Sequence, residues 1–244
     1  MNLTFQGGTA LILGGSSAIG LALTALVRQE GLTVIPTHAT QTGKTAIADT
    51  FPDLADLSPC FDLTDRTSQD SLRPCLESGI DYLVDLAQAD QEGLLAAAGE
   101  TATDDYFQAH IANRLHLLKS VTRAMLSRRF GRLLHVSSTA AALPAPGQGF
   151  YGAAKGASEA LYQSLGLELG ERGITSLNLR LGLVDAGRGA RFLDQGDRRH
   201  DLAPKIVTLD QAASTLFFLL SDQALALTCT TITMDAGLTA RKYA

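Results

Sequence analysis

Short apolar runs alternate with longer amphipathic segments along the chain of 244 residues. Apolar runs bounded by glycine and polar residues are typical of buried strands, and apolar positions three or four apart are typical of helices. Their regular alternation predicts a doubly wound α/β fold, a parallel sheet flanked by helices. The apolar runs predict seven strands, at 9–13, 33–37, 57–61, 82–86, 132–136, 176–181 and 231–234. The amphipathic segments predict helices at about 18–30, 42–50, 67–77, 103–128, 150–171 and 208–221.

The chain is predicted to form one domain over residues 1–244, because no Pro/Gly-rich linker, repeat or low-complexity stretch divides it. The longest segment without a clear period is 185–204, which follows the sixth predicted strand. Ligands of parallel sheets bind beyond the carboxyl ends of the strands. We therefore expect 185–204 to cover a bound ligand, with a solvated variable loop as the alternative.

Composition narrows the classes of function. A net charge of −5 gives no basic field for a nucleic-acid partner. Apolar runs such as Leu216–Leu220 are too short to span a bilayer, and the N-terminus lacks a signal-peptide pattern, so we expect a cytoplasmic protein without membrane contact. The three cysteines show no metal-ligand spacing and the five histidines do not cluster, so no metal site is predicted.

A glycine-rich turn, Gly14-Gly15-Ser16-Ser17-Ala18-Ile19-Gly20, lies between the first predicted strand and the first predicted helix. Glycines permit a tight turn with close backbone approach, and the free N–H groups of a helix N-terminus attract a pyrophosphate. The turn therefore predicts a Rossmann-like dinucleotide site. A turn shaped only by packing is the alternative.

The end of the second predicted strand bears on the choice of dinucleotide. A carboxylate there binds the ribose hydroxyls of NAD and repels the 2′-phosphate of NADP. This chain has no carboxylate at that place, and the residues present are compatible with a phosphate: Thr37, His38, Thr40 and Lys44. NADPH is therefore favoured over NADH. Asp62, which follows the third predicted strand, is a candidate to accept from an adenine amino group, with a simple turn aspartate as the alternative.

Tyr151 and Lys155 are four residues apart in a predicted helix, which places them on one helix face. An ammonium beside a phenol favours the phenolate and makes the phenol a better proton donor near neutral pH. Ser138, from the end of the preceding strand, is placed to hold a carbonyl oxygen against that acid. The three residues predict a proton donor for a carbonyl that receives hydride; a buried aromatic with a nearby lysine is the alternative.

In this order the segments resemble the short-chain dehydrogenase/reductase family over essentially the whole chain, and within it bacterial 3-oxoacyl-[acyl-carrier-protein] reductases. The resemblance implies that Tyr151 is the general acid, that Ser138 orients the substrate carbonyl and that Lys155 binds the nicotinamide ribose. It also implies that Asn113 holds a water linking Lys155 to solvent. The implied cofactor-binding residues are Gly14, Ser16, Ser17, Ile19, Gly20, Thr37, His38, Asp62, Leu63, Ala87, Tyr151, Lys155, Gly182 and Val184.

Three segments depart from the family pattern. Asp85-Leu86-Ala87-Gln88 stands where Asn-Asn-Ala-Gly is usual, and an ionised Asp85 accepts but does not donate hydrogen bonds. Gln88 brings a side chain where glycine lets the backbone approach the cofactor ribose. Leu181-Gly182 replaces Pro-Gly, and Ala186 or Gly187 replaces the threonine that bonds the nicotinamide carboxamide, so cofactor affinity is expected to be lowered or differently supplied.

The leading hypothesis is an NADPH-dependent ketoreductase that reduces a 3-oxoacyl thioester to the 3-hydroxyacyl form in fatty-acid or polyketide-type biosynthesis. Arg129 and Arg172 resemble the arginines that dock an acyl carrier protein; complementing helix dipoles is their alternative role. The family also implies a homodimer or tetramer. A reductase for a free small molecule, and a weakly active cofactor-binding partner subunit of a hetero-oligomer, are the competing hypotheses.

Overall fold

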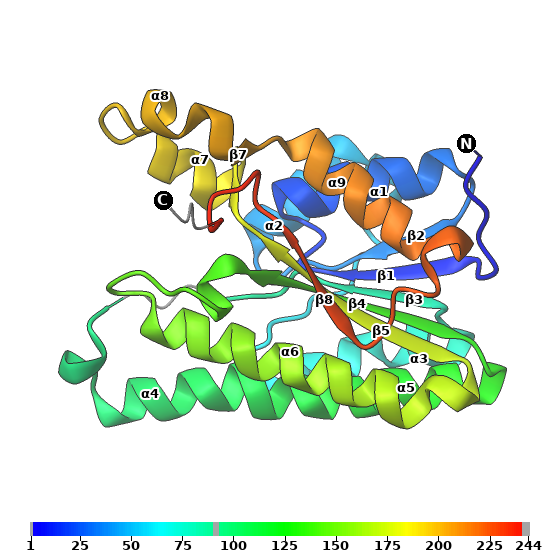
Figure 1. Cartoon of the computed structure of the whole chain (residues 1–244). Coiled ribbons are helices and arrows are strands. Elements are labelled where there is room, and N and C mark those ends of the chain that lie inside the picture. Colours follow the sequence, from blue (N-terminus) through cyan, green and yellow to red (C-terminus); the bar gives the residue numbers. More distant parts are fainter. Residues whose placement is uncertain (1, 90–92, 241–244) are drawn as a thin grey trace.

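The structure is a computed structural model that describes residues 2–89 and 93–240. At its centre lies a parallel sheet in the order β2-β1-β3-β4-β5-β8, covered by helices on both faces (Figure 1). The predicted Rossmann-like α/β class is therefore confirmed. The strands are β1 (Thr9–Leu13), β2 (Thr33–Pro36), β3 (Tyr82–Asp85), β4 (Gly131–Ser138), β5 (Ile174–Leu181) and β8 (Thr230–Met234).

The prediction of seven strands in the sheet is wrong, because the described sheet has six. Residues 57–61 run beside the end of β2 but form only an isolated parallel bridge between His38 and Cys60. Pro59, in the middle of this run, has no N–H to extend a ladder. Leu57 is 67% exposed, whereas Ser58 and Phe61 are buried, so the run is buried only in part.

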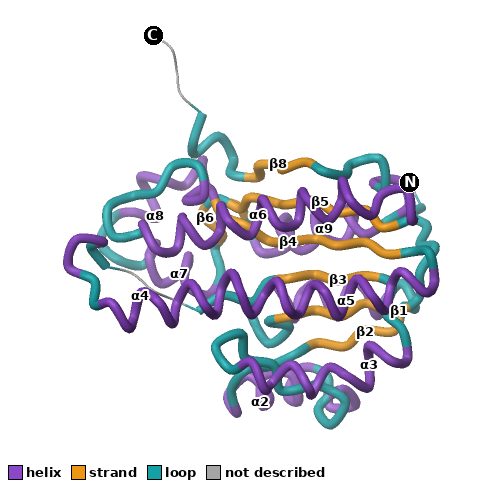
Figure 2. Tube along the Cα trace, turned by 90° about the horizontal axis from the view of Figure 1, so that it is seen from below, coloured by secondary structure: helices purple, strands orange, loops and turns teal. Residues whose placement is uncertain are grey.

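Two helical layers enclose the sheet, and successive strand residues face opposite layers. Ala10 and Ile12 pack in the cluster with α1 and α9, whereas Leu11 and Leu13 pack in the cluster with α5 and α6. This alternation is the period of two that a strand imposes. Figure 2 shows α5 and α6 lying over the sheet and running along the direction of its strands. The helices are α1 (Ala18–Gln29), α2 (Gln41–Thr50), α3 (Arg73–Ser78), α4 (Glu100–Phe107), α5 (Arg114–Arg128), α6 (Gly149–Leu169), α7 (Gly187–Leu193), α8 (Arg198–Leu202) and α9 (Leu209–Leu220).

The segment 185–204 is not an irregular loop, because it contains α7 and α8. A short parallel pair, β6 (Leu183–Val184) with β7 (Ile206–Val207), closes its base. The segment lies beyond the carboxyl end of β5, beside the chain around 238–240 (Figure 1). In the part of the chain that the structure describes, we find no helix with the length and apolarity that crossing a bilayer requires.

Candidate active site

A cavity of about 590 Å³ opens at the carboxyl ends of the strands. Ser138, the last residue of β4, and Tyr151, in the first turn of α6, both line it. The helix approaches the turn after β4 closely at Gly152, where a Cβ would lie 2.6 Å from the carbonyl oxygen of Ala140. The described residues that line the cavity come from the glycine-rich turn, the turn after β3, β4 and the turn after it, α6, the 181–187 region, α7, α8 and the segment after β8: among them Ile19, Leu143, Lys155, Gly182, Val184, Arg188, Phe192, Leu202 and Leu238.

Lys155 lies one helical turn after Tyr151 and is 3% exposed. Its Nζ is 6.0 Å from the centroid of the Tyr151 ring and donates to the carbonyl oxygen of Val136 at 2.7 Å. Burial, and next the positive charge of Arg114, lower the pKa of Lys155 to about 7. The predicted trio of Ser138, Tyr151 and Lys155 therefore meets at one cavity.

The glycine-rich turn has the shape that a pyrophosphate site requires. Gly14 has a φ of +68°, which side chains disfavour. A Cβ on Gly15 would lie 2.5 Å from Cβ of Pro36, and one on Gly20 would lie 2.6 Å from the carbonyl oxygen of Gly15. Ser17 caps α1, whose N-terminus points its free N–H groups out of the turn. The residues of this turn therefore fit a dinucleotide.

The side chains of Thr37 and His38 are buried and form hydrogen bonds with other residues of the protein. The Thr37 hydroxyl accepts from the backbone N–H of Gly14 at 3.1 Å and is fully buried. His38 Nδ1 lies 2.9 Å from the Ser58 hydroxyl, and burial, followed by the charge of Lys44, lowers the pKa of this histidine. Neither side chain is presented to a 2′-phosphate. Lys44, on the first turns of α2, is the remaining cation of the predicted set.

Asp62 and Leu63 follow the segment that pairs with His38, and both already make hydrogen bonds within the protein. The Asp62 carboxylate accepts from the backbone N–H and the hydroxyl of Thr64, at 2.9 and 2.8 Å, as a turn aspartate does. The Leu63 carbonyl oxygen accepts from Asn113 Nδ2 at 3.0 Å. Contacts of either residue with adenine remain a prediction.

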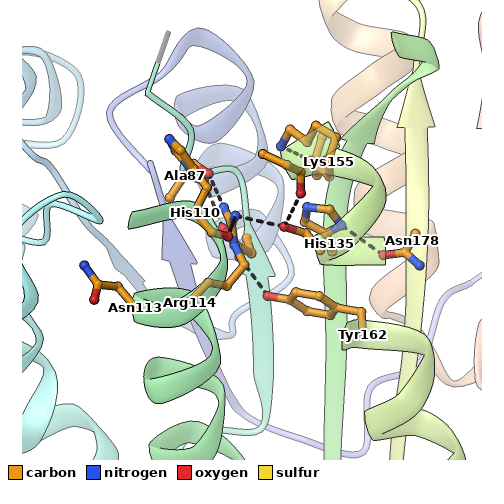
Figure 3. Close-up of polar contacts among 12 residues, drawn as sticks. Ala87, His110, Asn113, Arg114, His135, Lys155, Tyr162 and Asn178 are labelled. Carbon is orange, nitrogen blue, oxygen red and sulfur yellow. Dashed lines mark hydrogen bonds and ion pairs between the residues drawn. The ribbon is translucent and has the colours of Figure 1, made fainter. Parts of the chain in front are cut away.

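Asn113 does not join the catalytic trio. Its side chain points from the end of the π-helical turn Gln108–Asn113 toward Leu63, away from Lys155 (Figure 3). The water-binding role implied for it therefore finds no support in its placement. Its observed contact fixes the backbone of the segment after Asp62.

His110 is a buried residue next to Arg114 that the sequence reasoning did not connect with the site. It is fully buried in the π-helical turn, its ring centroid lies 4.2 Å from that of Tyr106, and neither ring nitrogen has a partner among the described residues. Burial, then the charges of Arg114 and Lys155, lower the pKa of His110 to about 3. A single sequence carries no signal for this, because the extra residue of the π turn changes which side chain faces the site.

The departure at Asp85 is compensated by a buried arginine. Asp85 Oδ2 accepts from Arg114 Nε at 2.8 Å and from the Tyr162 hydroxyl at 2.8 Å, while Oδ1 accepts from the N–H of Ala87 at 3.0 Å. Arg114 also donates to the carbonyl oxygens of Ala87 and His110 (Figure 3). Arg114 therefore supplies the donors that a carboxylate lacks. Burial alone would raise the pKa of Asp85, but the charge and the hydrogen bond of Arg114, together with the charges of His135 and Lys155, hold this pKa well below its usual range.

Gln88, the second departure, turns its amide toward Tyr106. Its Nε2 donates to the Tyr106 hydroxyl at 2.7 Å, and its buried Oε1 has no partner among the described residues. Ala186 and Gly187 line the cavity but carry no hydroxyl, so these two positions supply no threonine-like donor. The expectation that carboxamide contacts are differently supplied stays a prediction.

Arg129 and Arg172 do not flank the mouth of this cavity. Arg129 caps the C-terminus of α5 just before β4, and Arg172 lies in the 3₁₀ turn Gly170–Arg172 just before β5. Both are exposed, and their turns are joined by the bond from Gly131 N to Gly173 O at 3.1 Å. They therefore lie together at the amino ends of the strands, at the opposite edge of the sheet from Ser138.

Comparisons of the sequence and of the structure with known proteins both find oxidoreductases of one family. The short chain dehydrogenase family pattern matches residues 8–195, so the chain belongs to that family of oxidoreductases. It is 27% identical to the 3-oxoacyl-[acyl-carrier-protein] reductase FabG of Escherichia coli, over 97% of this chain and 99% of that protein. A solved short chain dehydrogenase/reductase family protein has a TM-score of 0.84 at 25% identity, covering 99% of this chain and all of that one. L-Sorbose reductase from Gluconobacter frateurii, solved with NADPH and L-sorbose, has a TM-score of 0.85 at 19% identity, covering 99% of this chain and 100% of that chain.

Proposed function

We propose that the protein is an NADPH-dependent ketoreductase that converts a 3-oxoacyl thioester into the 3-hydroxyacyl thioester. The observation that carries this proposal is the meeting of Ser138, Tyr151 and Lys155 at a cavity that also reaches the dinucleotide turn through Ser17 and Ile19. Bound NADPH would supply the hydride. The similarity to 3-oxoacyl-[acyl-carrier-protein] reductases over nearly the full length supports the thioester class.

The chain's own residues orient the carbonyl and provide the proton. The Ser138 hydroxyl and the Tyr151 phenol donate to the carbonyl oxygen, and Tyr151 transfers its proton as that oxygen becomes a hydroxyl. Lys155 stabilises the phenolate that remains and is held in place by its bond to Val136. The apolar lining, which includes Leu143, Phe192 and Leu202, excludes water and accommodates an acyl chain.

NADPH is the proposed cofactor because no carboxylate follows β2 and Lys44 lies close to that point. Thr40 caps α2, and its hydroxyl accepts from the N–H of Gly43 at 3.1 Å. The Lys44 side chain is 39% exposed and therefore accessible to a phosphate. Its ion pair with the exposed carboxylate of Asp56, at 3.9 Å, is weak enough for a phosphate to replace it. These residues take over the role that the buried side chains of Thr37 and His38 do not fill.

The test is NADPH oxidation, followed by absorbance, with acetoacetyl thioesters of N-acetylcysteamine and of acyl carrier protein. Tyr151→Phe removes the proton donor and should lower kcat by about a hundredfold or more. NADPH binding, followed by fluorescence, should persist and so show that the variant folds. Unchanged turnover of the phenylalanine variant, under conditions where chemistry limits the rate, contradicts the proposal.

An acyl carrier protein is the proposed partner, and a free small molecule is the second candidate substrate, favoured by the placement of Arg129 and Arg172 away from the cavity. Arg129→Glu should raise KM for the carrier-bound thioester and leave the N-acetylcysteamine thioester unaffected. Equal effects on both substrates, or none on either, point to the free substrate.

A further inference from the structure

The buried guanidinium of Arg114 joins three parts of the protein that meet at the site. Arg114 is the first residue of α5 and is fully buried. Its Nε donates to Asp85 Oδ2 at 2.8 Å, and its Nη2 donates to the carbonyl oxygen of Ala87. Its Nη1 donates to the His110 carbonyl oxygen at 2.9 Å and to the Ser158 hydroxyl at 3.0 Å. One planar group therefore connects the end of β3, the π-helical turn and α6 (Figure 3).

The Asp85–Arg114 pair holds both backbone polar groups of Ala87. The N–H of Ala87 donates to Asp85 Oδ1 at 3.0 Å, and its carbonyl oxygen accepts from Arg114. The two side chains are also bonded to each other, so the contacts form a closed ring. The turn 86–88 is therefore fixed by buried side chains of the protein itself, before any ligand binds.

The turn 86–88 lies directly against the glycine-rich turn that fits a dinucleotide. A Cβ on Gly14 would lie 3.2 Å from the carbonyl carbon of Leu86 and 3.3 Å from the nitrogen of Ala87. Leu86 and Gln88 line the cavity together with Ser17 of the glycine-rich turn. Ordering a loop only when a ligand binds costs entropy, so a turn that is already ordered binds its ligand more tightly.

The same pair is bonded to the helix that carries the proton donor. Ser158, which accepts from Arg114, is on α6 three residues after Lys155. The Tyr162 hydroxyl, one turn further along α6, donates to Asp85 Oδ2 at 2.8 Å. Because α6 contacts both members of the pair, the turn 86–88 and the reacting helix are held in a fixed relation to each other.

We propose that Arg114 is a positioning residue for cofactor binding. Together with Asp85 it preorganises the turn 86–88 beside the glycine-rich turn, at a set distance from α6. This inference rests on the proposed function, since it requires that the cavity takes a nicotinamide dinucleotide. Arginine is required because its planar fork reaches all four acceptors at once, whereas lysine presents the same charge from a single atom.

Arg114→Lys separates this positioning role from the buried charge. The lysine keeps a cation beside Asp85 but cannot bond Ala87, His110 and Ser158 together. The measurement is a fluorescence titration with NADPH, and in parallel with NADH, in the absence of any carbonyl substrate. We expect the dissociation constant of the dinucleotide to rise about tenfold or more, because the turn 86–88 must then be ordered on binding.

Arg132→Lys is the matched control. Arg132 is also fully buried, and its guanidinium likewise donates to two carbonyl oxygens and a hydroxyl, those of Leu219, Ala224 and Thr175. It lies at the start of β4, at the opposite end of that strand from Ser138. Arg132→Lys should lower the melting temperature as Arg114→Lys does, but leave the dissociation constant within about twofold of the wild type, since distant sites act independently.

Hydrogen exchange of the Ala87 amide, followed by NMR without ligand, reports on the turn itself. Its exchange should be slowed about a hundredfold or more in the wild type and in Arg132→Lys, and much less in Arg114→Lys. The wild-type measurement needs no variant, so it tests the inference even if Arg114→Lys does not fold.

Three results overturn the inference and leave the proposed function intact. They are wild-type affinity in Arg114→Lys, an equal loss of affinity in Arg132→Lys, and free exchange of the Ala87 amide in the wild type. A wild-type protein that binds neither NADPH nor NADH overturns the proposed function together with the inference.

Discussion

Replacing Arg114 by methionine should destabilise the protein strongly, because it leaves the Asp85 carboxylate buried without its cation. Arg114 and Asp85 are 0% and 1% exposed, and their shortest contact is 2.8 Å. In the folded variant Asp85 takes up a proton, because a buried carboxylate without a cation is unfavourable. Keeping a carboxyl of ordinary pKa protonated at pH 7 costs about 4 kcal/mol, which agrees with the roughly 3–5 kcal/mol measured for broken buried pairs.

Urea unfolding followed by circular dichroism measures this loss. The cost of Arg114→Met should shrink by about 1.4 kcal/mol for each pH unit between 7 and 5, because protonating Asp85 becomes easier. Asp85→Asn added to Arg114→Met should restore part of the lost free energy at pH 7, since the carboxylate is then absent. The bonds that Arg114 makes to the carbonyl oxygens of Ala87 and His110 stay lost in the double variant.

Arg28→Met is the matched control, since Arg28 makes a two-pronged pair with Asp53 at 2.9 Å but the side chains are 36% and 61% exposed. Its cost should be at most about 1 kcal/mol. An Arg114→Met cost as small as that of the control, or one that does not change with pH, refutes the reasoning about the buried pair.

Three further changes test the cofactor turn and the buried histidine. Lys44→Glu should raise KM for NADPH about tenfold or more and leave that for NADH nearly unchanged, by steady-state kinetics; equal effects contradict the phosphate role. Gly15→Val should weaken NADPH binding in fluorescence titrations, because its Cβ meets Pro36 at 2.5 Å, and unchanged affinity is the contrary result. Stability should fall as the pH drops from about 6.5 toward 3, because the unfolded chain protonates while folded His110, with its pKa of about 3, stays neutral. At pH 5 the loss from this group is about 2 kcal/mol, and His110→Gln should remove that part of the dependence in urea titrations.

Much of the fold and the reactive trio follows from local patterns. The run 9–13 is almost wholly apolar and the run 132–136 contains Leu133, Leu134 and Val136, and the structure has strands over both, because buried parallel strands need apolar runs. Tyr151 and Lys155 share a helix face by spacing alone. The run 57–61 was misjudged because apolar content does not show whether a neighbouring strand continues to pair; there Pro59 limits the ladder.

Long-range contacts decided the rest of the site. The sequence determines that Asp85 is acidic, that Thr37 and His38 follow β2, and that Arg188 lies in a long connection after β5. Only the tertiary structure pairs Asp85 with Arg114, 29 positions along the chain, turns Thr37 and His38 inward, and sets Arg188 over Tyr151. Spacing fixes neighbours within one helix or strand because the backbone repeats. The partner of a side chain from another element depends on how packing orients the two elements, and this is decided over the whole fold.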